Sequence, residues 1–305
     1  MKKLLFCLGL LSFVTLPFLS AQDSTTVQSI ALDESRNSLL WKVTGNELDV
    51  PSYVFGTIHM IGEEDYFFTD KMQAAFDDTK AAVFEIKVDD MMNPMALMSM
   101  MDKIMMNGGK SLSDLLTEEE YELVNDHFKK MGMPLMMLER MKPMFLSAFA
   151  SADMSPSGFN SGDIKSYELE LMKQAESKKK PIEGLETMDF QFSLFDSIPY
   201  EAQAKMLVDA IKMGDQGDDQ FQQMVELYKS QNIEAMQSIA VEDESGLGDF
   251  EALLLTQRNE NWIPKMQDMM ADKATFFAVG AGHLGGEKGV IRLLEQEGYI
   301  LTPIK

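Results

Sequence analysis

The stretch Gly56-Thr57-Ile58-His59-Met60-Ile61-Gly62-Glu63 recurs as a pattern near the other end of the chain, as Gly280-Ala281-Gly282-His283-Leu284-Gly285-Gly286-Glu287. Both stretches read G-x-x-H-x-x-G-E, and they hold two of the three histidines in this 305-residue chain. Each follows an apolar run typical of a strand and precedes a predicted helix and a second apolar run. We therefore predict a strand–loop–helix–strand unit that is used twice, with a histidine at the tip of its first strand.

The two units predict an α/β (α+β) protein with a mixed central sheet. Apolar runs at residues 53–55 and 81–86 belong to the first unit, and those at 275–279 and 299–301 belong to the second. A further strand at 39–43 forms a hairpin with the first motif strand, because turn-forming residues separate them. The ends of the chain must meet if the two histidines share a site. We therefore predict one domain over residues 38–305, with a large helical insertion at about 90–250.

The predicted place of the histidines favours a functional site. Ligands of open α/β sheets bind beyond the carboxyl ends of the strands, and a glycine three residues before each histidine allows a close approach of the backbone. Two histidines presented in this way can converge on one metal ion or one polarised carbonyl group. The alternative is that each histidine only caps a turn, and the matched pair argues against it.

The first 21 residues predict a secretory signal peptide. Lys2 and Lys3 are followed by an apolar stretch over residues 4–18, and Ala21 precedes the predicted cleavage position. An uncleaved anchor is the alternative. We expect a periplasmic or secreted protein with a flexible segment over residues 22–37 and no stable membrane span after cleavage. Cleavage would remove the only cysteine, Cys7, and with it any disulfide or thiolate chemistry.

The net charge of −22 limits the classes of partner. Such acidity disfavours nucleic acid and anionic membranes. We expect a peptide or small-molecule substrate, and the oligomeric state is not predicted.

The predicted helical insertion is rich in methionine, with eight methionines in residues 91–106 and six in 131–144. Methionine is an adaptable core filler, and it also lines surfaces that accept varied apolar ligands. Thioethers suit Cu(I), but the methionines show no regular spacing paired with histidine. The sequence therefore leaves core packing and an apolar binding surface as the two interpretations.

The order of the motifs resembles the TraB/GumN family, which is related to the membrane-tethered TIKI metalloproteases. The resemblance covers residues 38–303. It rests on the two G-x-x-H motifs and on the segments between them, which are Phe84-Glu85-Ile86, Tyr167-Glu168, Pro181-Ile182-Glu183-Gly184-Leu185-Glu186-Thr187 with Gln191, and Arg258-Asn259 with Trp262.

This resemblance implies a mixed α/β core and a metal-dependent peptidase, although more distant relatives bind haem or hydrolyse esters. The positions that it carries over are His59, His283, Glu85, Glu186 and Arg258. In the central helix, Glu168 stands where many relatives have Asp, which leaves its role open.

The chemistry of these residue types suits a catalytic divalent ion. Such a site has three protein ligands and an open position for water, and the bound water becomes a nucleophile near neutral pH. We predict His59, His283 and Glu186 as ligands of Mn, Co or Zn. Glu85 is the predicted general base or a partner of a histidine. Arg258 either steadies an oxyanion or substrate carboxylate or forms a salt bridge with a carboxylate of the site.

These assignments predict a secreted or periplasmic metal-dependent hydrolase that acts on peptides. One alternative is a protein that binds haem or another apolar ligand. The other is a metal-free, esterase-like hydrolase in which one histidine is a general base.

Overall fold

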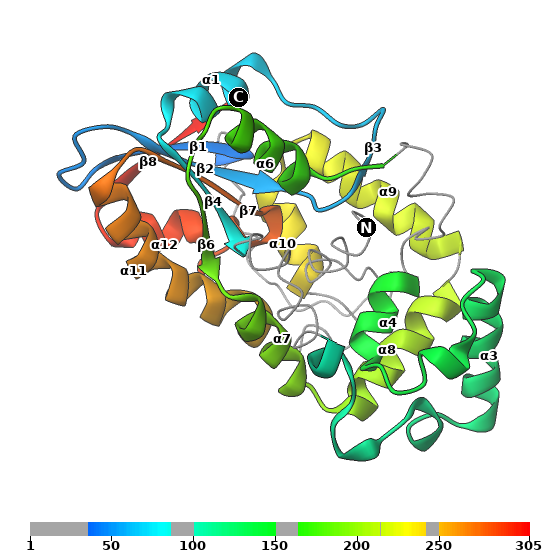
Figure 1. Ribbon diagram of the computed structural model, residues 1–305. Coiled ribbons are helices and arrows are strands. Elements are labelled where there is room, and N and C mark those ends of the chain that lie inside the picture. Colours follow the sequence, from blue (N-terminus) through cyan, green and yellow to red (C-terminus); the bar gives the residue numbers. More distant parts are fainter. Residues whose placement is uncertain (1–35, 87–100, 151–163, 214, 242–249) are drawn as a thin grey trace, which may run out of the picture.

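Six strands form the central sheet of the computed structural model, in the order β6-β4-β7-β2-β1-β8 (Figure 1). The structure describes residues 36–86, 101–150, 164–213, 215–241 and 250–305. Strand β1 is antiparallel to both of its neighbours, and the other five strands are parallel to one another. The mixed sheet confirms the predicted α/β class. Its strands are β1 (Leu40–Gly45), β2 (Ser52–Thr57), β4 (Ala81–Ile86), β6 (Ile182–Glu186), β7 (Thr275–Gly280) and β8 (Tyr299–Ile304).

The two G-x-x-H motifs leave neighbouring central strands. β2 and β7 are parallel, and Thr57 pairs with Gly280 at their carboxyl ends. After β2 the chain passes through α1 (Asp70–Asp78) to β4, and after β7 it passes through α12 (Val290–Gln296) to β8. The two connections run in opposite directions across the sheet, so right-handed crossovers place α1 and α12 on opposite faces (Figure 1). The repeated unit is therefore present, and both motifs begin at one edge of the sheet.

Gly56 allows the two motifs to touch. A Cβ atom on Gly56 would lie 2.7 Å from Cδ1 of Leu284 and 3.1 Å from Cα of Ala281. A larger residue would have to displace the side chain of Leu284 and would crowd Ala281 of the second motif. The first glycine of the first motif is thus explained by close packing against the second.

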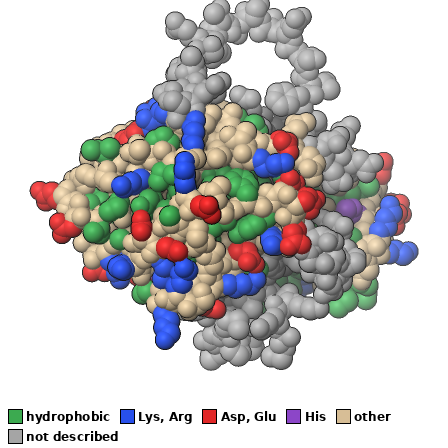
Figure 2. Space-filling model, turned by 90° about the horizontal axis from the view of Figure 1, so that it is seen from above, with side chains coloured by type: hydrophobic (Ala, Val, Ile, Leu, Met, Phe, Trp, Pro, Cys, Tyr) green, Lys and Arg blue, Asp and Glu red, His purple; other side chains and the backbone are tan. Residues whose placement is uncertain are grey.

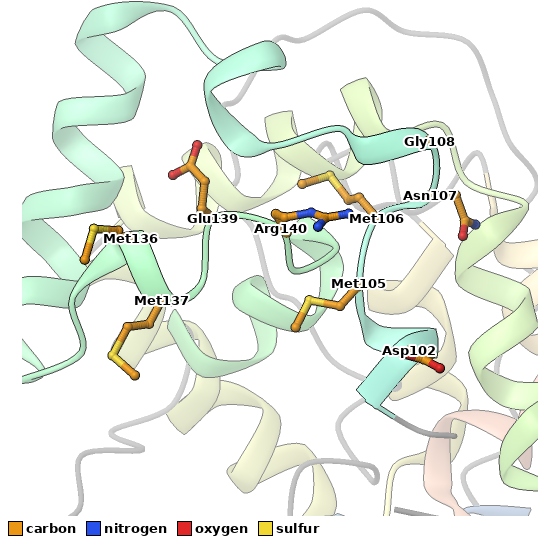
Figure 3. Close-up of a pocket in the computed structure, with 9 residues that line it drawn as sticks. All are labelled: Asp102, Met105, Met106, Asn107, Gly108, Met136, Met137, Glu139 and Arg140. Carbon is orange, nitrogen blue, oxygen red and sulfur yellow. The ribbon is translucent and has the colours of Figure 1, made fainter. Parts of the chain in front are cut away.

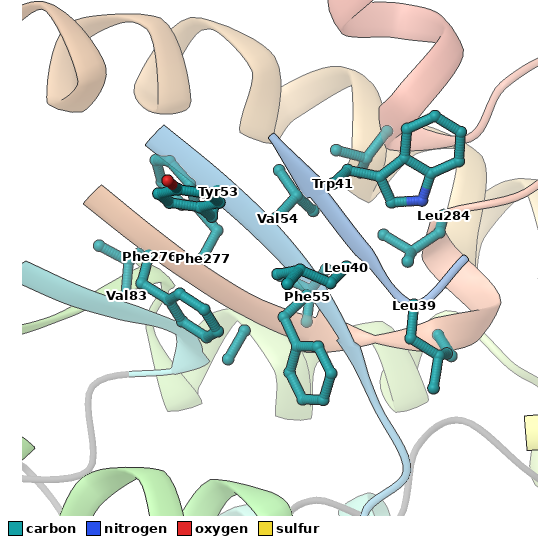
Figure 4. Packing of buried hydrophobic residues seen from close by; sticks show 14 of the residues in the cluster. Leu39, Leu40, Trp41, Tyr53, Val54, Phe55, Val83, Phe276, Phe277 and Leu284 are labelled. Atoms are coloured by element: carbon teal, nitrogen blue, oxygen red, sulfur yellow. The ribbon is translucent and has the colours of Figure 1, made fainter. Parts of the chain in front are cut away.

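The main hydrophobic core surrounds the central strands. Every residue of β2 and β7 is buried, because α1 and α6 (Tyr167–Ser177) cover one face and α11 (Gln257–Asp272) and α12 cover the other (Figure 1). This arrangement explains the continuous apolar runs of these strands. Aromatic rings dominate the packing (Figure 4), and the ring of Phe276 lies 5.9 Å from that of Phe55 and 5.2 Å from that of Phe76.

A second hydrophobic core lies among α3 (Glu118–Lys130), α4 (Pro143–Ala150), α7 (Met188–Asp196) and α8 (Tyr200–Met213). Helices α9 (Asp215–Lys229) and α10 (Ile233–Val241) return to the sheet, where Tyr228 and Met236 join the main core. The range predicted as an insertion also contains β6, the edge strand of the sheet, and β5 (Ile164–Lys165), which pairs with β3 (Ile61–Gly62). Several methionines are core fillers here, namely Met106, Met141, Met144, Met188 and Met206.

The predicted signal peptide lies outside the described residues, as does most of the predicted flexible segment. Among the helices that the structure describes, none is long and apolar enough to cross a membrane. On the face shown in Figure 2, Asp and Glu side chains lie interspersed with Lys and Arg. That face therefore presents no continuous basic patch.

The central position of Phe276 predicts a large cost for its truncation. We expect Phe276→Ala to lower the free energy of unfolding by about 3–5 kcal/mol, because the cavity would lie between the sheet and its helices. Ile300 on the edge strand β8 is 60% exposed, and we expect Ile300→Ala to cost less than about 1 kcal/mol. Urea denaturation measures both values. Equal costs would contradict the described core.

Candidate functional site

Four parallel strands bring the predicted site residues to one edge of the sheet. Glu85 is the penultimate residue of β4, and Glu186 ends the adjacent strand β6. His283 closes η8 (Ala281–His283), which directly follows β7, and His59 lies two residues beyond β2. Because the carboxyl ends of parallel strands meet at one edge, residues far apart in the sequence become neighbours.

Arg258 of α11 lies at the centre of this arrangement with only 1% of its surface exposed. Its Nη2 lies 2.5 Å from Oε2 of Glu85 and 2.9 Å from Oε2 of Glu186. Its Nε also donates to Glu186, and its Nη1 donates to the carbonyl oxygen of Leu254 at 3.1 Å and lies 3.1 Å from Nε2 of His283. A guanidinium has five N–H donors, and each faces an acceptor here. Arg258 has thus no N–H group left for a substrate oxyanion in this arrangement.

The helix that carries Arg258 contributes to this geometry. A π-helical turn, η7 (Ala252–Thr256), directly precedes α11 and contains Leu254, whose carbonyl oxygen accepts the Nη1 bond. The ring of Trp262, one turn beyond Arg258, lies under the guanidinium at 5.0 Å. Backbone and aromatic contacts therefore hold the cation from two sides.

The protonation of His283 follows from its two partners. Arginine only donates, so Nε2 of His283 accepts from Arg258, and Nδ1–H donates to Oδ1 of Asn259 at 2.6 Å. The amide nitrogen of Asn259 donates to the carbonyl oxygen of Lys288 at 2.9 Å, which fixes the orientation of the amide. The imidazole is fully buried and lies 4.5 Å from the ring of Trp262. Burial, and then the charge of Arg258, lower the pKa of His283 to about 3, so it is neutral and held in one tautomer.

Glu85 is ionised in this network. Burial by itself would raise the pKa of Glu85, but the nearby positive charge of Arg258 outweighs it and holds the pKa far below its usual range. The backbone N–H of Gly280 donates to its Oε1 at 2.8 Å. Gln191 donates to both carboxylates, at 3.3 Å to Glu85 and 3.1 Å to Glu186. A carboxylate held in this way is a weak proton acceptor near neutral pH, which favours the role of a partner in the network over that of general base.

His59 is held by a different carboxylate. Its Nδ1 lies 3.0 Å from Oε1 of Glu168 at the start of α6. Thr57 donates to the same oxygen at 2.7 Å, and Ser166 donates to Oε2 at 2.9 Å. Because the carboxylate accepts, Nδ1 carries the proton, and Nε2 is the basic nitrogen of the neutral ring. Burial disfavours the charged ring, but Glu168 outweighs it and raises the pKa of His59.

The two histidines are electrostatic neighbours with different partners. The charge of His59 acts on the pKa values of both His283 and Glu85. Yet His59 pairs with Glu168, whereas His283 and Glu186 both bind Arg258. The edge of the sheet therefore holds two adjacent groups, an inner one around Arg258 and an outer pair of His59 and Glu168.

This arrangement does not fit the predicted metal ligand set. In the part of the chain that the structure describes, no three His, Cys, Asp or Glu side chains form a group that could hold a metal ion. The donor atoms of Glu186 and His283 are engaged by the Arg258 guanidinium, so a cation already takes the place between them. A metal bound by His59, His283 and Glu186 would require Arg258 to move, and the assignment of these ligands stays a prediction.

The sequence predicts no definite role for several residues of the site. Glu168, Asn259, Gln191 and Trp262 stand in it only as parts of motifs. Their positions carried a signal, because Asn259 and Trp262 lie one and four residues after Arg258 on the same helix. Thr57, the second residue of the first motif, gave no signal at all.

The model of the TraB/PrgY/gumN family matches residues 39–303. The chain belongs to this family.

Its relatives in the family include proteins named Metalloprotease TIKI1. The chain is 23% identical to that of Xenopus tropicalis, over 92% of this chain and 64% of the relative, and 24% identical to that of Homo sapiens, over 86% and 61%. Metalloprotease TIKI2 of Xenopus tropicalis is 23% identical, over 87% of this chain and 60% of the relative. This family member thus spans about three fifths of the length of these relatives. No solved structure matches the chain significantly.

The Arg258 network predicts a large stability cost for loss of the cation. We expect Arg258→Met to lower the free energy of unfolding by about 3–5 kcal/mol at pH 7, because two buried carboxylates lose their counterion. When Glu85→Gln and Glu186→Gln are combined with Arg258→Met, part of the lost free energy of unfolding should be restored, because no unpaired carboxylate then remains buried. Lys205→Met, which breaks an exposed helix pair with Asp209, should cost about 0.5 kcal/mol. Urea denaturation distinguishes these outcomes, and an equal effect of Met at positions 258 and 205 would contradict the network.

The two histidines should affect stability on opposite sides of pH 6.5. The pKa of His283 is lower in the folded state than the ordinary 6.5, so the unfolded state binds more protons below that pH, and stability falls as the pH falls. The pKa of His59 is raised, so its stabilising effect is complete below pH 6.5 and is lost as the pH rises through the folded-state pKa. Each slope is at most about 1.4 kcal/mol per pH unit.

We therefore expect His283→Gln to flatten the stability profile between pH 6.5 and 5, and His59→Gln to flatten it above pH 6.5. Urea denaturation at a series of pH values measures the slopes. The reverse assignment, or two variants with the same profile, would contradict the described partners.

Proposed function

We propose that this chain is a hydrolase of peptide or ester carbonyl groups, in which His59 is the general base and Glu168 orients it. The observation that carries the proposal is the hydrogen bond between Nδ1 of His59 and the half-buried carboxylate of Glu168. A histidine oriented by a carboxylate is a recurrent device for proton transfer. The metalloprotease names of the TIKI relatives support hydrolytic chemistry in the same family.

The proposed reaction uses one nitrogen of His59 for both proton transfers. Nε2 removes a proton from water as the water oxygen attacks the carbonyl carbon. The tetrahedral intermediate then collapses, the bond to the leaving amine or alcohol breaks, and the protonated Nε2 returns its proton to the leaving group. Glu168 stabilises the transient imidazolium, because its carboxylate accepts a hydrogen bond from the Nδ1–H group of His59.

The Arg258 group has a positioning role in this proposal. Its ion pairs join the ends of β4 and β6 to α11, and Gly280 binds Glu85 at the end of β7. Gly56 then packs the loop of His59 against the second motif. The inner group thereby fixes the surface beside which His59 acts, and His283 is part of that support.

A metal-dependent hydrolase is the second candidate. It is favoured by the residue types at this edge of the sheet, two histidines with carboxylates, which suit a divalent ion such as Mn, Co or Zn. It is also favoured by the names of the relatives. It requires Arg258 to release Glu186 and His283. Haem binding has no comparable support, because both ring nitrogens of His283 face protein partners.

The test is hydrolysis of a fluorogenic casein-derived peptide and of p-nitrophenyl acetate by the purified protein. We expect His59→Ala to lower kcat by about 10²–10⁴-fold. Glu168→Gln should lower kcat by a smaller factor, because the base itself remains. The matched control is His127→Ala on α3, which should leave the rate unchanged. No hydrolysis of either substrate, or equal rates for His59→Ala and the wild type, would overturn the proposal.

The pH dependence of kcat/KM tests the role of Glu168 separately. The rate should rise with pH as His59 loses its proton, with an inflection above pH 6.5 because Glu168 raises the pKa of His59. Glu168→Gln should move that inflection to lower pH. Dialysis against EDTA separates the two candidates: retained activity supports the metal-free reaction, and loss that Mn, Co or Zn restores supports the metal-dependent one.

A further inference from the structure

The corner between α9 and α10, residues 228–234, contacts both G-x-x-H motifs. Tyr228, near the end of α9, donates from its hydroxyl to the carbonyl oxygen of Gly56 at 3.0 Å. Glu234, at the start of α10, accepts from the backbone N–H of Gly286 at 3.0 Å. One short segment of the helical part of the chain therefore lies against the first and the second motif at the same time.

The corner is fixed by its own packing. Ile233 and Met236 are buried in the main core, and a Cβ atom on Gly285 of the second motif would lie 2.5 Å from the carbonyl oxygen of Ile233. Lys229 forms an ion pair of 2.8 Å with Asp65, just beyond the first motif. The backbone of the corner is thus close to both motif loops and cannot shift without moving core side chains.

Tyr228 completes the hydrogen bonding where β2 leads into the first motif. The backbone N–H of Gly56 donates to the carbonyl oxygen of Leu39, just before β1, at 2.8 Å. Antiparallel strands usually return such a bond from the opposite residue. Here the N–H of Leu39 donates instead to Oε1 of Gln231 at 3.2 Å, and the carbonyl oxygen of Gly56 accepts from Tyr228. Two side chains of the corner therefore hold the chain at the point where pairing with β1 ends.

The ring of Tyr228 also packs against the helix that supplies Glu168. Its centre lies 5.5 Å from the ring of Tyr167, the residue before Glu168, and 5.7 Å from the ring of Phe67. The hydroxyl of Tyr167 donates to the carbonyl oxygen of Phe67 at 2.7 Å and accepts from its N–H at 3.2 Å. Tyr228 is fully buried, and burial raises the pKa of its hydroxyl well above the ordinary value, so the hydroxyl remains a donor. One side chain thus contacts both the first motif and the start of α6.

We propose that Tyr228 is a positioning residue for His59, which holds the first motif against α6 so that Nδ1 of His59 reaches Glu168. The hydrogen bond between His59 and Glu168 joins the loop after β2 to the start of α6, and Tyr228 contacts both of these segments. A displacement of about 1 Å at a reacting group can lower a rate by about 10²-fold. The effect on catalysis rests on the proposed function, whereas the placement of the imidazole does not.

The kinetic test uses Tyr228→Phe, which keeps the packed ring and removes only the hydroxyl. We expect kcat for p-nitrophenyl acetate to fall by about 10–10²-fold with KM unchanged, because the base is displaced while the surface that binds the substrate stays in place. The matched control is Tyr121→Phe on α3. Its hydroxyl donates to Glu139 at 2.7 Å, beside a pocket of about 490 Å³ in the helical part of the chain (Figure 3), and its loss should leave kcat unchanged. An unchanged kcat in Tyr228→Phe, or an equal fall in the control, contradicts the catalytic role.

Histidine NMR tests the placement of His59 without any substrate. In protein labelled with ¹⁵N-histidine, the Nδ1–H groups of His59 and His283 should each give a proton signal protected from exchange, because each is bonded to a protein oxygen. His59→Gln and His283→Gln assign the two signals. We expect Tyr228→Phe to broaden or remove the His59 signal and to leave the His283 signal in place. An unchanged His59 signal overturns the proposal, and so does equal loss of both signals, which would mean that the fold as a whole is loosened.

The two measurements separate failure of this inference from failure of the proposed function. If the wild type hydrolyses neither substrate, the proposed function fails, and the two histidine signals alone decide whether Tyr228 positions His59. If the wild type is active and His59→Ala is not, an unchanged kcat in Tyr228→Phe overturns the role of Tyr228 in catalysis and leaves that of His59 intact. Urea denaturation verifies that Tyr228→Phe and Tyr121→Phe are folded under the conditions of both measurements.

Discussion

The ion pairs between Arg258 and the two carboxylates of Glu85 and Glu186 are the constraint on which the site depends. A buried carboxylate without a counterion costs several kcal/mol, so neither glutamate can keep its position without the guanidinium. The same cation fixes the accepting nitrogen of His283. One side chain from α11 therefore determines the geometry at the ends of β4 and β6 and of the loop after β7.

The two G-x-x-H motifs place one repeated unit in two different surroundings. Both histidines follow central parallel strands, but their surroundings differ. The second motif packs beneath α11, where His283 is fully buried between Asn259, Trp262 and Arg258. The first motif lies beside the start of α6, where Glu168 accepts a hydrogen bond from Thr57 and binds Nδ1 of His59. The repeat supplies the position of each histidine, and the helix packed against it supplies the chemistry.

Methionine likewise has two roles that depend on position. In the second core it fills space between helices, as Met144 and Met206 do, and the flexible thioether suits irregular gaps. In the turn η5 (Leu135–Met137), Met136 and Met137 face solvent beside Arg140. The composition of this segment is therefore not explained by core packing alone.

The sequence by itself determined the elements of this protein and the edge at which its site lies. Short-range signals were sufficient for this: the alternation of apolar runs and turns predicted five strands of the central sheet, and the repeated motif identified His59 and His283. Family resemblance added Glu85, Glu186 and Arg258. Only the tertiary structure decided which of these side chains bind one another. Ion pairs and histidine tautomers depend on how α6 and α11 approach the sheet. The residues that meet there are more than twenty positions apart in the sequence, and the local sequence pattern carries no information on such contacts.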